Sequence, residues 1–218
     1  GLLVSANGDN LSSDILSPQI ASYYSLNKGN SKQSYPSSQM GSIALLRQSF
    51  YDFQYYTKSD LNFTDLSMEA WKSQMHLPRF FQTADKLEIL RASKIANEFN
   101  SSFIYLGSGN EYEAIDPLKK LNSKIVVPIN FPDAYDVSDP YISRLIPLSQ
   151  LKHWELAPLN FKILKENNIE VAISSSGLKS ADQFWKNIRL IIHSGVNKID
   201  VLKALTETPA NFIGQGEN

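Results

Sequence analysis

The sequence predicts an α/β protein built on a parallel β-sheet, and three observations support this prediction. Short unbroken apolar runs, typical of strands covered on both faces, occur at 103–106, 125–127 and 171–173. Segments with apolar residues at helical spacing separate these runs. The strands predicted at 79–81, 103–106 and 125–127 begin about twenty residues apart, the length of a βα unit. Such a sheet is either closed as a barrel or open and doubly wound.

The remaining parts of the chain follow this pattern less regularly. Residues 2–4 are all apolar and have the composition of a further buried strand. A stretch rich in Ser and Asn at 25–38 predicts an exposed loop. The segment at 131–158 is punctuated by prolines, and because proline interrupts helices and strands we expect it to be a long loop.

Helices are predicted from apolar stripes and from capping signals. Asp85 and Ser180 are each followed three residues later by Glu or Gln, a spacing typical of a capping box. Asn197 is expected to cap the last helix, which should end near Thr208 because Pro209 follows. The predicted helices lie at 40–56, 85–99, 111–121, 158–167, from 180 onward, and 199–205.

Composition excludes several classes of function. The chain has 218 residues with 21 basic and 22 acidic side chains, so its net charge of −1 gives no field that would attract nucleic acid. The absence of cysteine excludes disulfides, thiolate nucleophiles and cysteine zinc sites. No apolar run is long enough to span a membrane, and no signal peptide is recognised, so the compartment is not predicted. The chain opens at Gly1 without a methionine, and we expect it to be a fragment of a longer protein.

Function in a βα architecture depends on the loops that leave the carboxyl ends of the strands. These loops begin at Gln82, Gly107, Asn130 and Ser174, and they are rich in hydroxyl and amide groups but poor in groups that bind metals. The sequence therefore predicts a polar pocket without an identified catalytic residue. The candidate pocket-lining residues are Gln82, Asp85, Ser108, Asn130 and Ser176.

The three histidines do not form a metal site in the sequence. His76 precedes a predicted strand, His153 falls in the predicted long loop, and His193 ends a predicted helix. None follows the carboxyl end of a strand, and neither an HxH nor an HExxH motif is present. We therefore expect surface or structural roles for all three, and no metal bound by this chain.

Two glycine- or serine-rich loops allow alternative interpretations. Gly107-x-Gly109 lies between a strand and a helix, as in dinucleotide-binding proteins, but Tyr112 occupies the third glycine position, and a tight βα turn explains the pair equally. The loop at 174–177 offers backbone N–H groups to a phosphate or carboxylate, or is simply a strand-to-helix connection.

Carboxylates in the loops also have two interpretations each. Asp85 either acts on a substrate or caps the helix that follows it. Asp133, Asp136 and Asp139 either bind a cation or are solvated side chains of a surface loop.

Several stretches together resemble one protein family, the amidohydrolase superfamily, and in particular its imidazolonepropionase-like branch of large bacterial proteins. The closing Ala-Leu-Thr-x-x-Pro-Ala pattern at 204–210 is the most specific of them. The resemblance covers nearly the whole chain but corresponds only to the middle and later part of such a protein. The other stretches are Tyr35-Pro36-Ser37-Ser38-Gln39-Met40-Gly41 with Leu46-Arg47-Gln48, Asp85-Lys86-Leu87-Glu88-Ile89-Leu90-Arg91-Ala92, Val127-Pro128-Ile129-Asn130-Phe131-Pro132, and Trp154-Glu155-Leu156-Ala157-Pro158-Leu159-Asn160.

The resemblance implies a distorted TIM-like (β/α)8 barrel that hydrolyses C–N bonds other than peptide bonds. In such proteins zinc or another divalent metal activates a water molecule. Family members hold the metal through an HxH motif after the first strand, a histidine after each of strands five and six, and an aspartate after strand eight. The positions that correspond to the last three are about Gln82, Gly107 and Ser176 in this sequence.

These positions lack good metal ligands, and the segment that would carry the HxH motif has no counterpart in the chain. The resemblance therefore implies that residues 1–218 form a single incomplete (β/α) barrel domain, without the small flanking β-sandwich, and that this chain alone is inactive and holds no metal. An open sheet edge would favour association with a second copy or with the missing part of the parent chain.

Two other functions stay open. The chain is alternatively a non-catalytic binding module, whose polar pocket captures a small molecule or a peptide. A third hypothesis is a barrel enzyme that binds a phosphate-bearing substrate at the loop 175–177.

Overall fold

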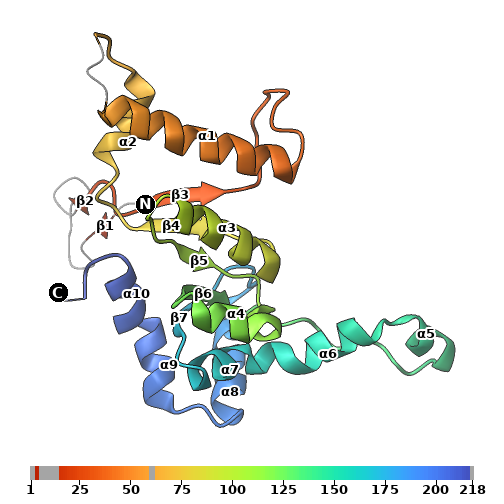
Figure 1. Cartoon of the computed structure of the whole chain (residues 1–218). Coiled ribbons are helices and arrows are strands. Elements are labelled where there is room, and N and C mark those ends of the chain that lie inside the picture. Colours follow the sequence, from red (N-terminus) through yellow and green to blue (C-terminus); the bar gives the residue numbers. More distant parts are fainter. Residues whose placement is uncertain (1–2, 5–14, 59–61, 217–218) are drawn as a thin grey trace. The chain divides into compact units, whose positions relative to one another are not determined.

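The computed structural model describes residues 3–4, 15–58 and 62–216. Its contacts divide into two compact units, which are described separately. The first unit comprises Gly1–Gln82 and Ala92–Phe103, and the second comprises Thr83–Arg91 and Ile104–Asn218. Figure 1 labels the helices and strands along the chain.

The first unit contains a parallel strand pair and two helices that follow its first strand. Strand β3 (Ser22–Ser25) pairs in parallel with β4 (Arg79–Gln82), with Ser22 opposite Arg79. Helices α1 (Gln39–Lys58) and α2 (Leu66–Ser73) lie between these strands in the sequence. The carboxyl-terminal part of α3 (Lys86–Glu98) also belongs to this unit.

Aromatic rings make up much of the core of the first unit. The ring of Phe50 lies 4.7 Å from that of Phe99 and 5.0 Å from that of Trp71. Phe81 is completely buried, and its ring lies 5.0 Å from that of Phe103. These contacts explain why α1 carries its apolar stripe, because burial of aromatic surface is the main stabilising contribution of such a helix.

The second unit contains three parallel strands in the order β5-β6-β7. These strands are β5 (Ile104–Leu106), β6 (Lys124–Pro128) and β7 (Glu170–Ser174). Leu106 lies opposite Val126, and Val126 lies opposite Ala172. The parallel pairing in both units confirms the predicted α/β class. The core around these strands is apolar. Its fully buried side chains come from the strands (Ile125, Val127 and Val171) and from the helices that cover them (Leu118, Leu164 and Ile191).

The helices of the second unit follow its strands in βα order. A 3-10 turn (Glu111–Ala114) leads into α4 (Ile115–Lys120), and a second 3-10 turn (Ala157–Leu159) leads into α7 (Asn160–Glu166). Ser180 caps α8 (Ala181–His193) by accepting a 3.2 Å hydrogen bond from the Gln183 N–H, as predicted. Asn197 likewise caps α9 (Lys198–Leu205). No helix of the described residues is both long and apolar enough to cross a membrane.

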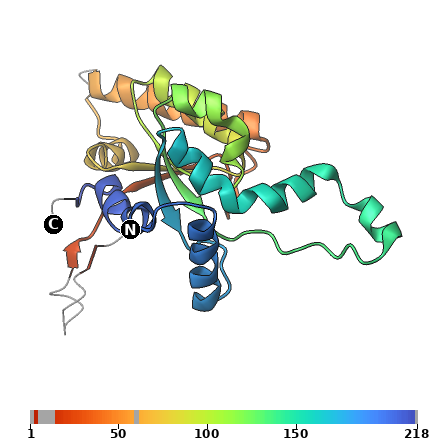
Figure 2. The ribbon, with the colours of Figure 1, turned by 90° about the horizontal axis from the view of Figure 1, so that it is seen from below.

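Two expectations about the elements were wrong. The strand predicted at 2–4 is reduced to β1 (Leu3–Val4), which pairs antiparallel with β2 (Ile15–Ser17), a nearby segment of the chain; Leu2 lies outside the described residues. The segment predicted as a long loop contains α5 (Pro140–Leu145) and α6 (Leu148–Leu156), and this part projects from the rest of the second unit in Figures 1 and 2. Pro140 is the first residue of α5 and Pro147 directly precedes α6, positions where a missing N–H costs nothing.

Helix α9 ends at Leu205, ahead of Pro209 as predicted, but a further helix follows it. Helix α10 (Glu207–Phe212) includes this proline as its third residue. A proline is tolerated there because the N–H groups of the first turn have no acceptor within the helix.

Candidate functional site at the carboxyl ends of the strands

The loops that follow β5, β6 and β7 begin side by side at one edge of the second unit. Hydrogen bonds continue the strand ladder past the strand ends, since the Gly107 N–H donates to the Val126 carbonyl (2.8 Å) and the Ile129 N–H to the Ser174 carbonyl (3.2 Å). The parallel direction of the strands thus brings together the loops at 107–111 and 174–177 with the residues that follow Pro128. This edge is the candidate functional site.

A buried carboxylate occupies the middle of the first loop. Glu111 has no solvent-exposed surface. Its Oε1 accepts hydrogen bonds from the Ser108 N–H (2.6 Å) and the Gly109 N–H (3.1 Å), and its Oε2 accepts one from Asn160 Nδ2 (2.7 Å). These donors compensate the cost of burying a charge, which would otherwise be large.

The same carboxylate explains the absence of a side chain at Gly107. A Cβ added at Gly107 would lie 2.5 Å from Oε1 and 2.8 Å from Cδ of Glu111. The dinucleotide interpretation of Gly107-x-Gly109 is therefore wrong: the N–H groups that would cradle a phosphate are bonded to the chain's own carboxylate. The glutamate escaped the sequence analysis because nothing in the sequence distinguishes a buried carboxylate from a solvated one at the start of a helix.

A tyrosine and a histidine extend this network toward the projecting helix α6. The Asn160 Oδ1 accepts a 2.9 Å hydrogen bond from the Tyr112 N–H, and the Tyr112 hydroxyl lies 3.0 Å from Nδ1 of His153. Burial, with a further contribution from the charge of Glu111, raises the pKa of Tyr112 above its ordinary value. His153 is thus a residue of α6 with a defined partner, and not a loop residue as predicted.

Residues after β6 and β7 make a second cluster at the same edge. Gly177 adopts φ +80°, and a Cβ there would collide with the side-chain amide of Asn130. The buried Asn187 donates from Nδ2 to the Ile129 carbonyl (2.6 Å), which fixes the backbone next to Asn130. The N–H of Ser176 is already bonded to the Ser174 hydroxyl (3.1 Å), so this loop offers fewer free donors to an anion than its sequence suggests.

The candidate pocket-lining residues fall in both units. Gln82 belongs to the first unit, where its Oε1 accepts a 3.1 Å hydrogen bond from the Tyr23 hydroxyl. Asp85, Ser108, Asn130 and Ser176 belong to the second unit. That all five line one pocket stays a prediction.

Asp85 and Ser108 each have a defined local role. The Asp85 side chain accepts a 2.8 Å hydrogen bond from the Glu88 N–H, while Glu88 accepts one from the Ala84 N–H (2.7 Å), so the capping interpretation is confirmed. The Ser108 hydroxyl donates to Asn110 Oδ1 (2.8 Å), a bond within the same loop as Glu111.

The residues at this edge do not fit a divalent metal. Among the described residues no group of three or more His, Asp or Glu side chains is arranged to hold one. His193 ends α8, and His76 lies between α2 and β4. Two aspartates of the proline-rich segment have local partners: Asp136 accepts from the Ser138 hydroxyl (2.6 Å), and Asp139 caps α5. Hydrogen bonds from Ser138 lower the pKa of Asp136.

Comparison with known proteins gives one informative match. No protein-family model and no curated protein matches the sequence. The structure is similar to the crystal structure of an amidohydrolase from Thermotoga maritima MSB8, with a TM-score of 0.74 and 19% sequence identity. The match covers 98% of this chain and 57% of that chain. The chain therefore has the α/β fold of part of an amidohydrolase barrel over nearly its whole length, and it spans little more than half of the matched protein.

Proposed function

We propose that this chain is part of an amidohydrolase-like protein of the imidazolonepropionase-like branch, and that by itself it does not hydrolyse C–N bonds. The fold similarity and the family-like stretches of sequence support the first part of the proposal. The second part depends on one observation. The loop after β5, where the family carries a metal-binding histidine, starts with Gly107 and is filled by the carboxylate of Glu111.

The chemistry of the other two positions supports the same conclusion. Gln82 presents an amide oxygen that is already hydrogen-bonded to Tyr23, and an amide is a weak ligand for zinc. Ser176 presents a neutral hydroxyl in place of a carboxylate. Glu111 does not replace these ligands, because its oxygens are bonded to the backbone and to Asn160, and its side chain is fully buried.

Elemental analysis tests this proposal. The chain is produced in medium supplemented with zinc, manganese and iron, exchanged into metal-free buffer, and analysed for bound metal per mole of protein. We expect far less than one equivalent of any of the three. One equivalent of metal that is lost in a Gln82→Ala or a Ser176→Ala variant would overturn the proposal, since it would assign ligation to those positions.

A binding role is the second candidate, and the fixed conformation of the polar loops favours it. Glu111 fixes the loop that carries Ser108, and Asn130 packs against Gly177, so hydroxyl and amide groups are held in place at one edge of the second unit. Preorganised polar groups of this kind recognise small polar ligands. NMR titration with panels of small carboxylates, sugars and short peptides should shift the amide signals of 107–111 and 174–177. Unchanged signals with every panel would remove this candidate.

A further inference from the structure

The part of the second unit that projects in Figures 1 and 2 consists of residues 131–156, here called the arm. The arm comprises an irregular segment (131–139) followed by α5 and α6. These helices have six and nine residues, and neither has a buried residue. Helices of this length are marginal in water unless another surface packs against them. The arm is anchored at its base, where His153 meets Tyr112, but its outer part lacks such a surface within the described chain.

The outer part of the arm exposes large apolar side chains. Tyr141 and Leu145 of α5 are 79% and 80% exposed, and Leu148 at the start of α6 is 65% exposed. Tyr141 and Leu145 are four residues apart and therefore share one face of α5. Single exposed apolar residues are common on proteins, but a cluster of them on a short helix indicates a surface that another molecule covers.

The arm is acidic as well as apolar. Its irregular segment contains Asp133, Asp136 and Asp139 and no basic residue. The whole arm has four carboxylates against two cations, Arg144 and Lys152. This excess of negative charge disfavours an anionic membrane or a nucleic acid as the partner, and it also disfavours contact with a second arm. A complementary partner surface should be apolar and basic.

Helix α8 of the same unit presents such a surface. Trp185 is 55% exposed, and Lys186 and Arg189 are exposed beside it, since residues three and four positions apart share a helix face. Neither cation makes a hydrogen bond or an ion pair with another residue that the structure describes. Asp182 is the one carboxylate of α8. In both Figures 1 and 2 α5 lies away from α8, so the arm does not cover this surface within one copy.

A pocket at the start of α8 adjoins this surface. Leu178, Lys179 and Phe184 are among its lining residues. The ring of Phe184 lies 5.1 Å from that of Trp185, so the pocket continues the exposed apolar surface of the helix. The start of α8 thus offers an apolar hollow beside a further cation.

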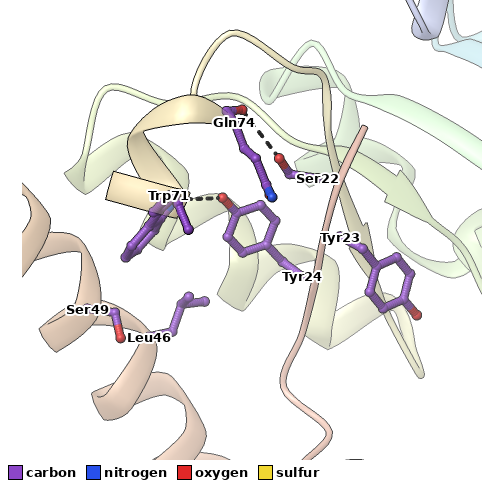
Figure 3. Close-up of a pocket in the computed structure, with 8 residues that line it drawn as sticks. Ser22, Tyr23, Tyr24, Leu46, Ser49, Trp71 and Gln74 are labelled. Carbon is purple, nitrogen blue, oxygen red and sulfur yellow. Dashed lines mark hydrogen bonds between the residues drawn. The ribbon is translucent and has the colours of Figure 1, made fainter. Parts of the chain in front are cut away.

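A pocket of the first unit, shown in Figure 3, fits the arm less well. Trp71 Nε1 donates a 3.1 Å hydrogen bond to the Tyr24 hydroxyl there, and Leu46 adds a further apolar contact surface. None of the residues that line this pocket carries a formal charge. It therefore offers nothing that would select an acidic segment.

We propose that the arm of one copy docks on α8 of a second copy, and that two copies exchange arms about a two-fold axis. Tyr141 and Leu145 cover Trp185 and the adjoining pocket, while the acidic segment faces Lys186 and Arg189. The apolar contact supplies most of the affinity, and the charges select the partner surface. A reciprocal exchange makes this contact twice, which is needed because stable interfaces bury about 1,200–2,000 Å² in total and one short helix covers only part of that area. The interface is separate from the open sheet edge and does not depend on the proposed function.

Sedimentation velocity over a range of concentrations tests the proposal, and the wild type should dimerise as its concentration rises. One double variant, Asp133→Lys with Asp136→Lys, reverses the charge of the acidic segment. The other, Lys186→Glu with Arg189→Glu, reverses the charge of α8. Each alone should weaken dimerisation by about tenfold or more, because like charges then face each other. An equimolar mixture of the two should dimerise again, since both contacts of a mixed dimer pair opposite charges.

A matched control reverses two exposed cations elsewhere in the second unit. Lys119→Glu with Lys120→Glu on α4 should leave dimerisation unchanged. Tyr141→Ser should weaken the dimer without any change of charge, which keeps the test decisive if a charge variant fails to fold, as circular dichroism would show.

Three results would overturn the proposal. The first is a wild type that stays monomeric at every concentration at which it is soluble. The second is dimerisation that Tyr141→Ser and both double variants retain, which would assign it to the open sheet edge. The third is a mixture of folded double variants that dimerises no better than its components, which would favour contact between two arms. None of these results depends on the metal content that tests the proposed function.

Discussion

At the scale of single residues, Glu111 is the side chain on which the candidate site depends most. It is a fully buried carboxylate with donors from two backbone groups and from Asn160. Charge-assisted bonds of this kind are stronger than neutral ones, and leaving their donors without an acceptor is costly. The conformation of the loop at 107–111 therefore depends on one buried carboxyl side chain.

A Glu111→Gln variant should lower the free energy of unfolding by about 2 kcal/mol, because an amide NH2 would face donors that now meet an oxygen. Urea denaturation measures this change. Glu155→Gln removes a charge from an exposed position on α6 and serves as the control, which should differ from the wild type by only a few tenths of a kcal/mol. Equal stability of the two variants would contradict the role of Glu111.

A second prediction concerns pH and the first unit. Hydrogen bonds from Arg47 and Tyr51 lower the pKa of Glu98. A lowered pKa in the folded state contributes stability that is present above the ordinary glutamate pKa and is lost as pH falls through the lowered value. The wild type should therefore exceed Glu98→Gln in stability at neutral pH, and this difference should disappear in acid. Urea titrations at a series of pH values test the sign, and a difference that grew on acidification would contradict it. The group is solvent-exposed, so the difference should be small.

At the scale of elements, helices and strands are predicted most accurately where residues act on their immediate neighbours in the chain. The apolar strands and the capped helices α8 and α9 are confirmed because cap residues and buried runs act locally. Strand β3 was missed since Ser22-Tyr23-Tyr24-Ser25 is not an apolar run, and Tyr23 is 63% exposed. Helix α2 was missed although Asp65 caps it with bonds to the N–H groups of Ser67 and Met68, a signal that was present in the sequence.

Helix α8 offers a direct test of a predicted cap. Ser180→Ala removes the acceptor for the Gln183 N–H and should cost about 1 kcal/mol of stability. Ser180→Thr keeps a hydroxyl at this position and should retain most of it. Thermal or urea unfolding followed by circular dichroism compares the two variants, and indistinguishable behaviour would show that the cap does not contribute.

The edge at which the polar loops meet was predictable from the sequence, but the hydrogen bonds within it were not, and a functional role for this edge stays a prediction. Parallel strands dictate that loops after β5, β6 and β7 share one edge, so Ser108, Asn130 and Ser176 could be named from the sequence. The bonds that organise this edge join residues far apart in the chain, such as Glu111 with Asn160 and Asn187 with Ile129. Side-chain partners at such separations are fixed by tertiary packing, which no local pattern reveals.

At the scale of the whole molecule, the fold similarity extends over 98% of the chain, whereas the expectation of one incomplete barrel domain stays a prediction. The near balance of 21 basic and 22 acidic residues predicts no affinity for nucleic acid. The chain should pass through a heparin column unretained at about 50 mM salt, where even weak contacts with a polyanion are favoured. Retention that is lost at higher salt would contradict this expectation and point to a local basic surface.

The contact between Gly107 and Glu111 constrains how this protein could evolve or be engineered toward metal dependence. Histidine cannot simply be introduced at 107, because its Cβ would lie 2.5 Å from Glu111 Oε1, and moving this carboxylate would break its hydrogen bonds to Ser108, Gly109 and Asn160. Shortening Glu111 first would leave the donors of Ser108, Gly109 and Asn160 unsatisfied. Each single step is thus unfavourable on its own, and the two positions form an epistatic pair. A path to a metal-binding loop therefore has to change both positions together, because neither point mutation is favourable on its own.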